Sequence, residues 1–455
     1  MTTAPDTGSG AALAAWAATC RWEDVPEAVR HQARRCLVNL FACALAGRRD
    51  EAVRIAARVL ATLGPAGDCV VIGESRTAGL QHAAALNAMA ANVHDFDDTH
   101  VPTILHPTAP VAPVLLALAH TRRMTGAELL HALVIGIEME CRIALAVSPH
   151  HYTRGWHITS TCGIFGAALA AGRVLGLDAQ RMLWAMGSAS AQAGGLVETL
   201  GTMAKSAGVG HCASGGLMSA LLAREGFDGP PLALEGARGF LRVFGDGEVR
   251  LMTDDLGRDW EIQRNAFKPY PCGVVLNPVI DACLALHATL PQGLPALARI
   301  ELRGNPLLRQ RTDRPGVTSG KLSQVCAQHA VAMALSRGRA GLAEFCDAAV
   351  RDPASAALGS LVRFIDDPSM HVEEAEVRLL PANGGAPLTH HVRAARGSLA
   401  APLSDADLTA KLTTLAADSG ADVDAHALTD ALWTIERCAD VADLMRLARG
   451  RGAPT

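Results

Sequence analysis

Helical spacing of small apolar residues is the feature that most constrains the fold of this chain. In residues 11–62, Ala, Leu and Val recur among Arg and Glu at helical intervals, as in the segment VRHQARRCLVNLFACALAG that ends at Gly47. This spacing predicts a succession of amphipathic helices. Hydrophobic residues make up 49% of the chain and aromatic residues only 4%. The core must therefore be built mainly from Ala, Leu and Val, which favours closely packed helices.

Further helices are predicted downstream. The runs 78–93 and 109–121 are apolar and of helical length. The run 126–147 follows Thr125, and Glu128 three residues later completes the spacing of a capping box. A later helix carries small residues along one face, so another helix can approach it closely: Gly163, Gly166, Ala167, Ala170 and Ala171.

Extended segments are predicted at four places, three of them after residue 265. Residues 66–75 and 296–306 each read as a short extended piece. AEVRLLP (375–381) and THHVRAARGS (389–398) predict a hairpin with a Gly-Gly turn. A helix is expected at 325–338. The chain is therefore predicted to be mostly α with a smaller α+β part.

Domain organisation follows from length and from this change of pattern. A chain of 455 residues is too long for one compact core. Amphipathic helices return from Ser404 to about Ala448. We predict a large helical domain formed by residues 1–265 and 403–455, and an inserted α+β domain formed by residues 266–402.

Composition excludes several functional classes. A net charge of -4 gives no basic footprint for nucleic acid or a membrane surface, and no apolar run reaches the ~18 residues of a spanning helix. The twelve cysteines include no CxxC pair and no Cys/His spacing for zinc. We expect buried thiols in a reducing compartment. Since MTTAPDTGSG also lacks the basic start of a secretory signal, we expect a soluble cytoplasmic protein.

Residues 94–110, HDFDDTHVPTILHPTAP, form the first candidate site. They contain His94, Asp95, Asp97, Asp98, Thr99, His100 and His106. If the preceding helix continues, Asp95, Asp98 and Thr99 share one face, and the two prolines that follow end the helix and turn His106 back across it. Carboxylates beside imidazoles orient a histidine for acid–base chemistry. The structural alternative is a helix cap followed by a solvated acidic loop.

Two further positions are candidates. His157 lies next to a predicted helix start in GWHIT, and Lys205 is the only lysine before Lys268. A buried lysine can lose its proton, whereas arginine cannot. The structural alternatives are a core histidine bonded to a backbone carbonyl and a surface lysine. No glycine pattern fits a nucleotide, because 316–322 lacks the Ser/Thr of a phosphate loop. We therefore expect no metal, iron–sulfur cluster or nucleotide cofactor.

Five sequence blocks, in this order, carry a resemblance to a known family. They are DFDDTH…LHPTAP, GWHITSTCGIFGAALAA, GTMAK…GFDGP, FKPYPCG…IDA and QHAVAMAL…DP. The chain resembles the MmgE/PrpD family over about residues 30–450. That family includes 2-methylcitrate dehydratase, cis-aconitate decarboxylase and iminodisuccinate epimerase. The resemblance implies a homodimer, a small polycarboxylate substrate, and an active site in a cleft between the helical domain and an α+β lid.

The resemblance also implies roles for individual residues. Catalytic candidates are Asp95, His106, His157 and Lys205, and substrate-binding candidates are Thr99, His100, Lys268 and Cys272. His106 and His157 would exchange protons, Asp95 would orient an imidazole, and both lysines would hold carboxylates or protonate the product. Two departures from the family pattern are Gly208 and Asn277, which stand where many members have histidine.

These residues fit more than one reaction. Family members share formation of a carbanion-like centre next to a carboxylate, which needs a base and nearby cations. We expect a cofactor-independent lyase, first of all a dehydratase of the 2-methylcitrate type, with a decarboxylase or an epimerase as alternatives. Outside the family, DFDDT could hold magnesium for diphosphate ionisation, although aromatic residues are scarce. A helical binding protein that has lost catalysis is the non-enzymatic alternative. Residue identity alone does not choose among them.

Overall fold

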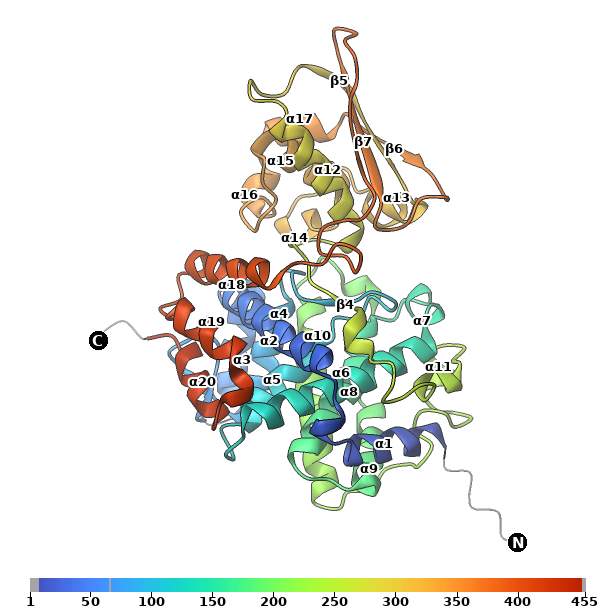
Figure 1. Cartoon of the computed structure of the whole chain (residues 1–455), viewed down its shortest axis with the longest axis vertical. Coiled ribbons are helices and arrows are strands. Elements are labelled where there is room, and N and C mark those ends of the chain that lie inside the picture. Colours follow the sequence, from blue (N-terminus) through green and yellow to red (C-terminus); the bar gives the residue numbers. More distant parts are fainter. Residues whose placement is uncertain (1–7, 65–66, 452–455) are drawn as a thin grey trace. The chain divides into compact units, whose positions relative to one another are not determined.

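The computed structural model describes residues 8–64 and 67–451, which form two compact units (Figure 1). The helical unit consists of the described residues up to Val93 together with Asp97–Asn265 and Ser404 onward. The mixed unit consists of His94–Phe96 and Ala266–Leu403. The short segment His94–Phe96 thus belongs to the mixed unit, although it lies between two parts of the helical unit in the sequence.

The regular secondary structure of the helical unit is almost entirely α-helix. Its helices are α1 (Ser9–Thr19), α2 (Glu27–Gly47), α3 (Glu51–Leu63), α4 (Leu80–Asn92), α5 (Thr108–Leu118), α6 (Gly126–Val147), α7 (His150–Thr153), α8 (Ile158–Val174), α9 (Ala179–Ser190), α10 (Ala204–Arg224), α11 (Phe240–Phe244), α18 (Asp405–Ser419), α19 (Ala425–Trp433) and α20 (Val441–Ala448). Short strands β1 (Cys69–Val70) and β2 (Thr77–Ala78) pair antiparallel, and β3 (Thr99–His100) lies in the loop before α5. The extended piece expected near 66–75 is confirmed for the described residues that form β1.

Helix α8 packs closely on its neighbours because its small residues lack obstructing side chains. A Cβ added at Gly166 would lie 2.7 Å from the backbone oxygen of Gly136 in α6, and one added at Gly163 would lie 2.8 Å from Pro110 in α5. Both distances are below normal van der Waals contact, so larger residues would separate these helices. The close helix approach predicted from the small-residue face is confirmed.

Helix ends follow their capping residues. The Thr125 side chain accepts from the Glu128 amide, and the Glu128 carboxylate accepts from the Thr125 amide, which confirms the predicted capping box. The continuation of α4 into the aspartate-rich segment is wrong, because α4 ends at Asn92 and Asp95 has a left-handed φ of 52°. A left-handed residue interrupts the helical hydrogen-bond pattern.

The C-terminal helices belong to the helical unit. Lys411 in α18 donates a 2.8 Å hydrogen bond to the Asn39 side chain in α2, and Trp433 in α19 donates to Thr409 in α18. Both chain ends therefore build one core. No helix among residues 8–64 and 67–451 is long and apolar enough to cross a membrane.

The mixed unit contains a four-stranded sheet with helices against it (Figure 1). Its elements are α12 (Asn277–Ala288), β5 (Leu297–Gly304), α13 (Pro306–Thr312), α14 (Gly320–Ser323), α15 (Ala327–Arg337), α16 (Asp347–Val350), α17 (Pro353–Gly359), β6 (Val362–Asp366), β7 (Ala375–Pro381) and β8 (Leu388–Val392). The strand order is β6-β5-β7-β8, with β5 and β6 parallel and the other pairs antiparallel. The predicted hairpin is confirmed as β7 and β8. Side chains from α12, α15 and the sheet share one apolar core.

Candidate active site

The aspartate-rich segment enters the helical unit as an ordered and buried turn. Asp97, Asp98, Thr99 and His100 are each at most 2% exposed, and His106 is 7% exposed. A solvated acidic loop, the structural alternative from the sequence, is therefore wrong for these residues. Burying several polar groups together is costly unless they are hydrogen-bonded, so their partners determine what the segment can do.

His106 is fixed through one ring nitrogen. Its Nδ1 lies 2.9 Å from the backbone oxygen of Asp98, 3.4 Å from the Asp97 carboxylate and 3.5 Å from Thr99 Oγ1. A carbonyl oxygen can only accept, so Nδ1 carries the hydrogen and the basic lone pair of the neutral ring is on Nε2. The His106 amide donates to Thr159 Oγ1 at 3.1 Å. This arrangement presents a histidine of defined tautomer.

The carboxylate beside His106 within the helical unit is that of Asp97. Its Oδ2 accepts a 2.8 Å hydrogen bond from Asn92 at the end of α4, while its Oδ1 faces His106 Nδ1. Asp95, which the sequence suggested for the orienting role, belongs to the mixed unit, and Asp97 is a further candidate that the sequence did not single out. The only available signal was proximity in DFDDT, which does not distinguish three neighbouring aspartates.

Two buried acids, Asp98 within this turn and Glu140 in α6, have raised pKa values. Asp98 accepts hydrogen bonds from Thr108 and Asn265, yet burial raises its pKa from 3.8 to about 6. Glu140 of α6 is fully buried, and neither of its carboxyl oxygens has a hydrogen-bond partner among the described residues. Burial, and then the charge of Asp98, raises the pKa of Glu140 well above its usual value. Such a group is held as the neutral acid at moderate pH.

His157 is fixed at the start of α8. It is 4% exposed, its Nδ1 lies 2.7 Å from Ser160 Oγ, and its amide donates to the backbone oxygen of Gly195. A Cβ added at Gly208 in α10 would lie 2.7 Å from Ser160 Oγ. The absence of a side chain at Gly208 therefore leaves room for the hydroxyl group that orients His157. This is a physical reason for one departure from the family pattern.

Lys205 lies in the first turn of α10 and is partly buried. It precedes Gly208 by three residues, so the two share a face of α10, and Gly208 abuts Ser160 of α8. Lys205 therefore extends from the face of α10 that contacts Ser160, the residue hydrogen-bonded to His157. The first turn of a helix also favours bound anions, because unpaired amides and the helix dipole are positive there.

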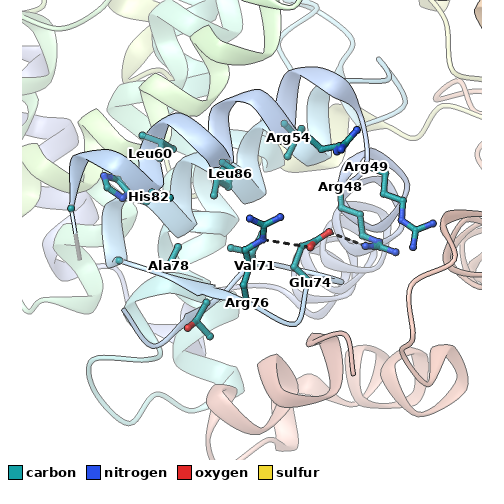
Figure 2. Close-up of a pocket in the computed structure, with 16 residues that line it drawn as sticks. Arg48, Arg49, Arg54, Leu60, Val71, Glu74, Arg76, Ala78, His82 and Leu86 are labelled. Carbon is teal, nitrogen blue, oxygen red and sulfur yellow. Dashed lines mark hydrogen bonds and ion pairs between the residues drawn. The ribbon is translucent and has the colours of Figure 1, made fainter. Parts of the chain in front are cut away.

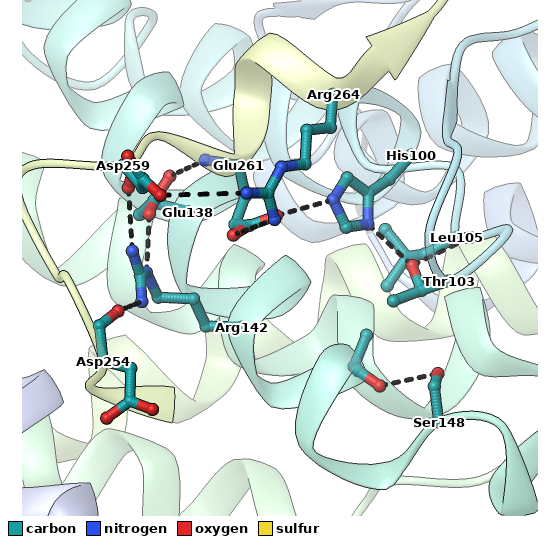
Figure 3. A network of polar contacts seen from close by, with 11 residues as sticks. His100, Thr103, Leu105, Glu138, Arg142, Ser148, Asp254, Asp259, Glu261 and Arg264 are labelled. Carbon is teal, nitrogen blue, oxygen red and sulfur yellow. Dashed lines mark hydrogen bonds and ion pairs between the residues drawn. The ribbon is translucent and has the colours of Figure 1, made fainter. Parts of the chain in front are cut away.

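His100 is part of an internal polar network (Figure 3). Its Nε2 donates to Glu261 at 3.0 Å and its Nδ1 accepts from Thr103 at 2.8 Å. Burial lowers the pKa of His100. The Glu261 amide donates to Glu138, which also accepts from Arg142 at 2.6 Å. With both ring nitrogens engaged, His100 is better explained as a structural residue than as the substrate ligand expected from the sequence.

The remaining candidates lie in the mixed unit. Lys268 is 3% exposed, and its Nζ lies 3.0 Å from the Asp95 backbone oxygen and 3.1 Å from its carboxylate. Asp95 thus pairs with Lys268 within this unit. Cys272 is fully buried beside Asn277, at 3.8 Å from its side-chain oxygen, and burial raises the pKa of its thiol. A buried, protonated thiol has little means of contacting a substrate.

Comparison with known proteins identifies two family domains in the sequence. Residues 11–251 match the MmgE/PrpD N-terminal domain, and residues 270–436 match the MmgE/PrpD C-terminal domain. These matches cover most of the chain.

Among curated proteins, a cis-aconitate decarboxylase-like protein of Aspergillus oryzae is 31% identical over 63% of this chain and 63% of its own length. A cis-aconitate decarboxylase of Aspergillus terreus is 28% identical over 61% of this chain and 60% of its own length. The cis-aconitate decarboxylase of Homo sapiens is 30% identical over 46% of this chain and 45% of its own length. The matched regions thus span less than two thirds of these relatives.

Proposed function

Because the chain belongs to the MmgE/PrpD family, we propose that it is a lyase that decarboxylates a small tricarboxylate of the cis-aconitate type. The similar curated proteins are named as cis-aconitate decarboxylases, which supports this alternative over the dehydratase that we expected first. The proposal concerns the whole chain, although each relative is matched over only part of its length.

The observation that carries the proposal is that two imidazole rings in the helical unit are each oriented by a hydrogen bond at Nδ1. His106 is held through Nδ1 by the Asp98 carbonyl oxygen, and His157 is held through Nδ1 by Ser160. Both rings are at most 7% exposed. A histidine that is oriented through one nitrogen can exchange protons through the other, which is the arrangement expected of acid–base groups.

Decarboxylation of a cis-aconitate trianion requires a proton donor and positive charge beside the carboxylates. The bond between the methylene carbon and its carboxylate breaks, carbon dioxide leaves, and the electron pair spreads over an allyl system that is conjugated with the remaining carboxylates. One proton then adds to the far allyl carbon and gives a dianion. The reaction consumes a proton and needs cations beside the carboxylates, where negative charge develops.

The proposed roles follow from position and chemistry. His157 delivers the proton, Lys205 holds a substrate carboxylate, and His106 is the second acid–base group. In the mixed unit, Lys268 contributes positive charge that Asp95 partly balances. These roles need no redox step, and we propose that the residues act without a cofactor.

Proton NMR in D2O with cis-aconitate, 2-methylcitrate and iminodisuccinate tests the proposal. We expect cis-aconitate to lose carbon dioxide and its product to carry one deuterium, with the other two substrates unchanged. Elimination of water from 2-methylcitrate, or epimerisation of iminodisuccinate, at a higher rate would contradict the decarboxylase proposal and identify which alternative holds. No turnover of any of the three would favour the binding-protein alternative.

A further inference from the structure

A cavity lined by several arginines, the arginine-lined cavity, lies within the helical unit. It has a volume of about 610 Å³ and lies among the end of α2, helix α3, the β1–β2 turn and the start of α4 (Figure 2). Its lining includes none of the candidate site residues. The volume is within the range of cavities that hold small organic ligands.

The cavity is strongly cationic. Four arginines line it, Arg48, Arg49, Arg54 and Arg76, and among the described residues of the lining Glu74 is the only one with a carboxylate. Figure 2 shows Glu74 between Arg48 and Arg76, at 2.8 Å and 3.8 Å from their side-chain nitrogens. Four guanidinium groups against one carboxylate leave positive charge in excess. Arginine cannot relieve this repulsion by losing a proton, so an anion would stabilise the arrangement.

Arg49 and Arg54 are less well paired with negative charge than Arg48. Arg54 pairs with the exposed Glu51 outside the lining, at 3.3 Å. Arg49 donates to the Gly420 backbone oxygen, which carries no charge. An exposed ion pair adds little stability, and a carbonyl does not neutralise a guanidinium. Both side chains can therefore turn toward an anion at little cost.

Arg48 shows that the site is built into the fold. Its side chain is only 7% exposed, with Nη1 bonded to Glu74 and Nη2 bonded to the Ser419 backbone oxygen. Its buried Nε has no hydrogen-bond partner among the described residues. A buried guanidinium with an unfilled donor is costly, and only one of the partners of Arg48, Glu74, carries a compensating charge.

One wall of the cavity is apolar. Ala57, Leu60 and Ala61 of α3 line this wall and are at least partly exposed. Behind them, Val53, Val71 and Leu86 are at most 5% exposed. Figure 2 shows Leu60 and Leu86 on the helices opposite the Glu74–Arg76 turn. A bare inorganic ion would leave this surface unused, whereas a ligand with a hydrocarbon body would cover it at a gain proportional to the area buried.

We propose that this cavity binds a small organic dianion, either a phosphate monoester or a dicarboxylate, whose charged head contacts the arginines and whose short hydrocarbon body lies on the apolar wall. Arg48 provides a fixed contact, and Arg49 and Arg54 close around the charged head. Guanidinium groups bind phosphate and carboxylate oxygens in paired, charge-assisted hydrogen bonds. The site is separate from the proposed catalytic residues, so its occupant need not be the substrate.

Isothermal titration of the full chain with hexyl phosphate, hexylmalonate, phosphate and malonate tests this proposal. We expect one hexyl compound, or both, to bind at least about tenfold more tightly than the matching bare ion, because a buried hydrocarbon chain adds to the charge contacts. The better hexyl compound identifies the head group. Absence of binding by both hexyl compounds at low millimolar concentration would overturn the proposal.

A matched set of variants locates the binding. The double variant Arg49→Gln/Arg54→Gln should weaken binding about tenfold or more, since each removes a charge-assisted contact. The control is Arg58→Gln, because Arg58 lies on α3 with Arg54, is exposed and does not line the cavity. Equal weakening by the control would show diffuse charge attraction, and unchanged binding by the double variant would place the ligand elsewhere. Either result would overturn the proposal, whatever the enzyme turns over.

Discussion

Replacing Asp98 by asparagine should change the pH dependence of stability in a defined way. Burial raises the pKa of Asp98 from 3.8 to about 6. A carboxyl with a raised pKa stabilises the fold fully only below its unfolded pKa, and this contribution is lost as the pH rises through the folded pKa. A shift of about two units, at about 1.4 kcal/mol per unit, corresponds to about 3 kcal/mol lost between pH 3.8 and pH 6. Asp98→Asn keeps the shape and removes the titration.

The difference between two proteins isolates Asp98 and the groups that interact with it. Urea unfolding of wild type and Asp98→Asn, followed by far-UV circular dichroism at several values between pH 4 and pH 7.5, gives the free energy of unfolding of each. Titrating groups that do not interact with Asp98 cancel in the difference. Glu140 does not cancel, because the charge of Asp98 contributes to its raised pKa. We expect the variant to gain about 2.5 kcal/mol relative to wild type from pH 4 to pH 7.5, because a small part of the contribution is already lost at pH 4. An oxygen at position 98 can still accept from Thr108 and Asn265, so the hydrogen bonds of Asp98 are retained.

Asp228→Asn is the matched control, because Asp228 is exposed in the loop after α10. Its difference from wild type should stay within about 0.5 kcal/mol over the same range, as for most surface substitutions. A flat difference for Asp98→Asn, or one that falls as the pH rises, would refute the argument. It would mean that the charge of Asp98 is compensated in the fold, so that Thr108 and Asn265 outweigh the cost of burial.

Three further predictions concern the proposed catalytic residues. His157→Gln and Lys205→Ala should each lower turnover of cis-aconitate roughly 10²–10⁴-fold with an unchanged circular dichroism spectrum; folded variants that keep more than a tenth of wild-type turnover would contradict their roles. Gly208→Ala should crowd Ser160 and lower turnover or the melting temperature, at a cost of about 1–3 kcal/mol, whereas Gly194→Ala, where a Cβ meets open space, should not. Turnover should also survive exhaustive chelation, and activity restored only by an added metal would contradict the cofactor-independent proposal.

Local sequence signals predicted most of the secondary structure. The capping box at Thr125 and Glu128 predicted the start of α6, and the apolar run 78–93 predicted α4 to within two residues. These signals worked because caps and helical spacing act over one or two turns. The Gly-Gly turn between β7 and β8 is local in the same way.

The candidate site was less predictable, because its geometry depends on contacts distant in the sequence. The helical spacing of the sequence continues without interruption here. It does not indicate that α4 ends at Asn92 or that Asp95 has a left-handed conformation. The partnership of His100 with Glu261 joins residues 161 positions apart. Ser160 had a usable signal, since it follows His157 by three residues at a helix start, where such side chains face each other.

The buried acids could have been anticipated in part. Glu138, Glu140 and Arg142 interrupt the apolar run of α6, and three charged residues within a long apolar helix suggest internal pairing. The sequence predicts one pair, Glu138 with Arg142, because these residues are four positions apart. It does not reveal that Glu140 is left without a partner, because that depends on the close approach of α8 at Gly166.

The two proposed sites use different cationic residues, and this difference suits them to different chemistry. The helical unit contains over twenty arginines but only two lysines, Lys205 and Lys411, and Lys411 is bonded to Asn39. The arginine-lined cavity contains four arginines, which stay charged at every accessible pH, and one histidine, His82. Its arginines can hold an anion but cannot exchange a proton with it. Lys205 and the two oriented histidines can do both. The arginines of the arginine-lined cavity are therefore suited to binding an anion, whereas a polycarboxylate beside Lys205 could also be converted.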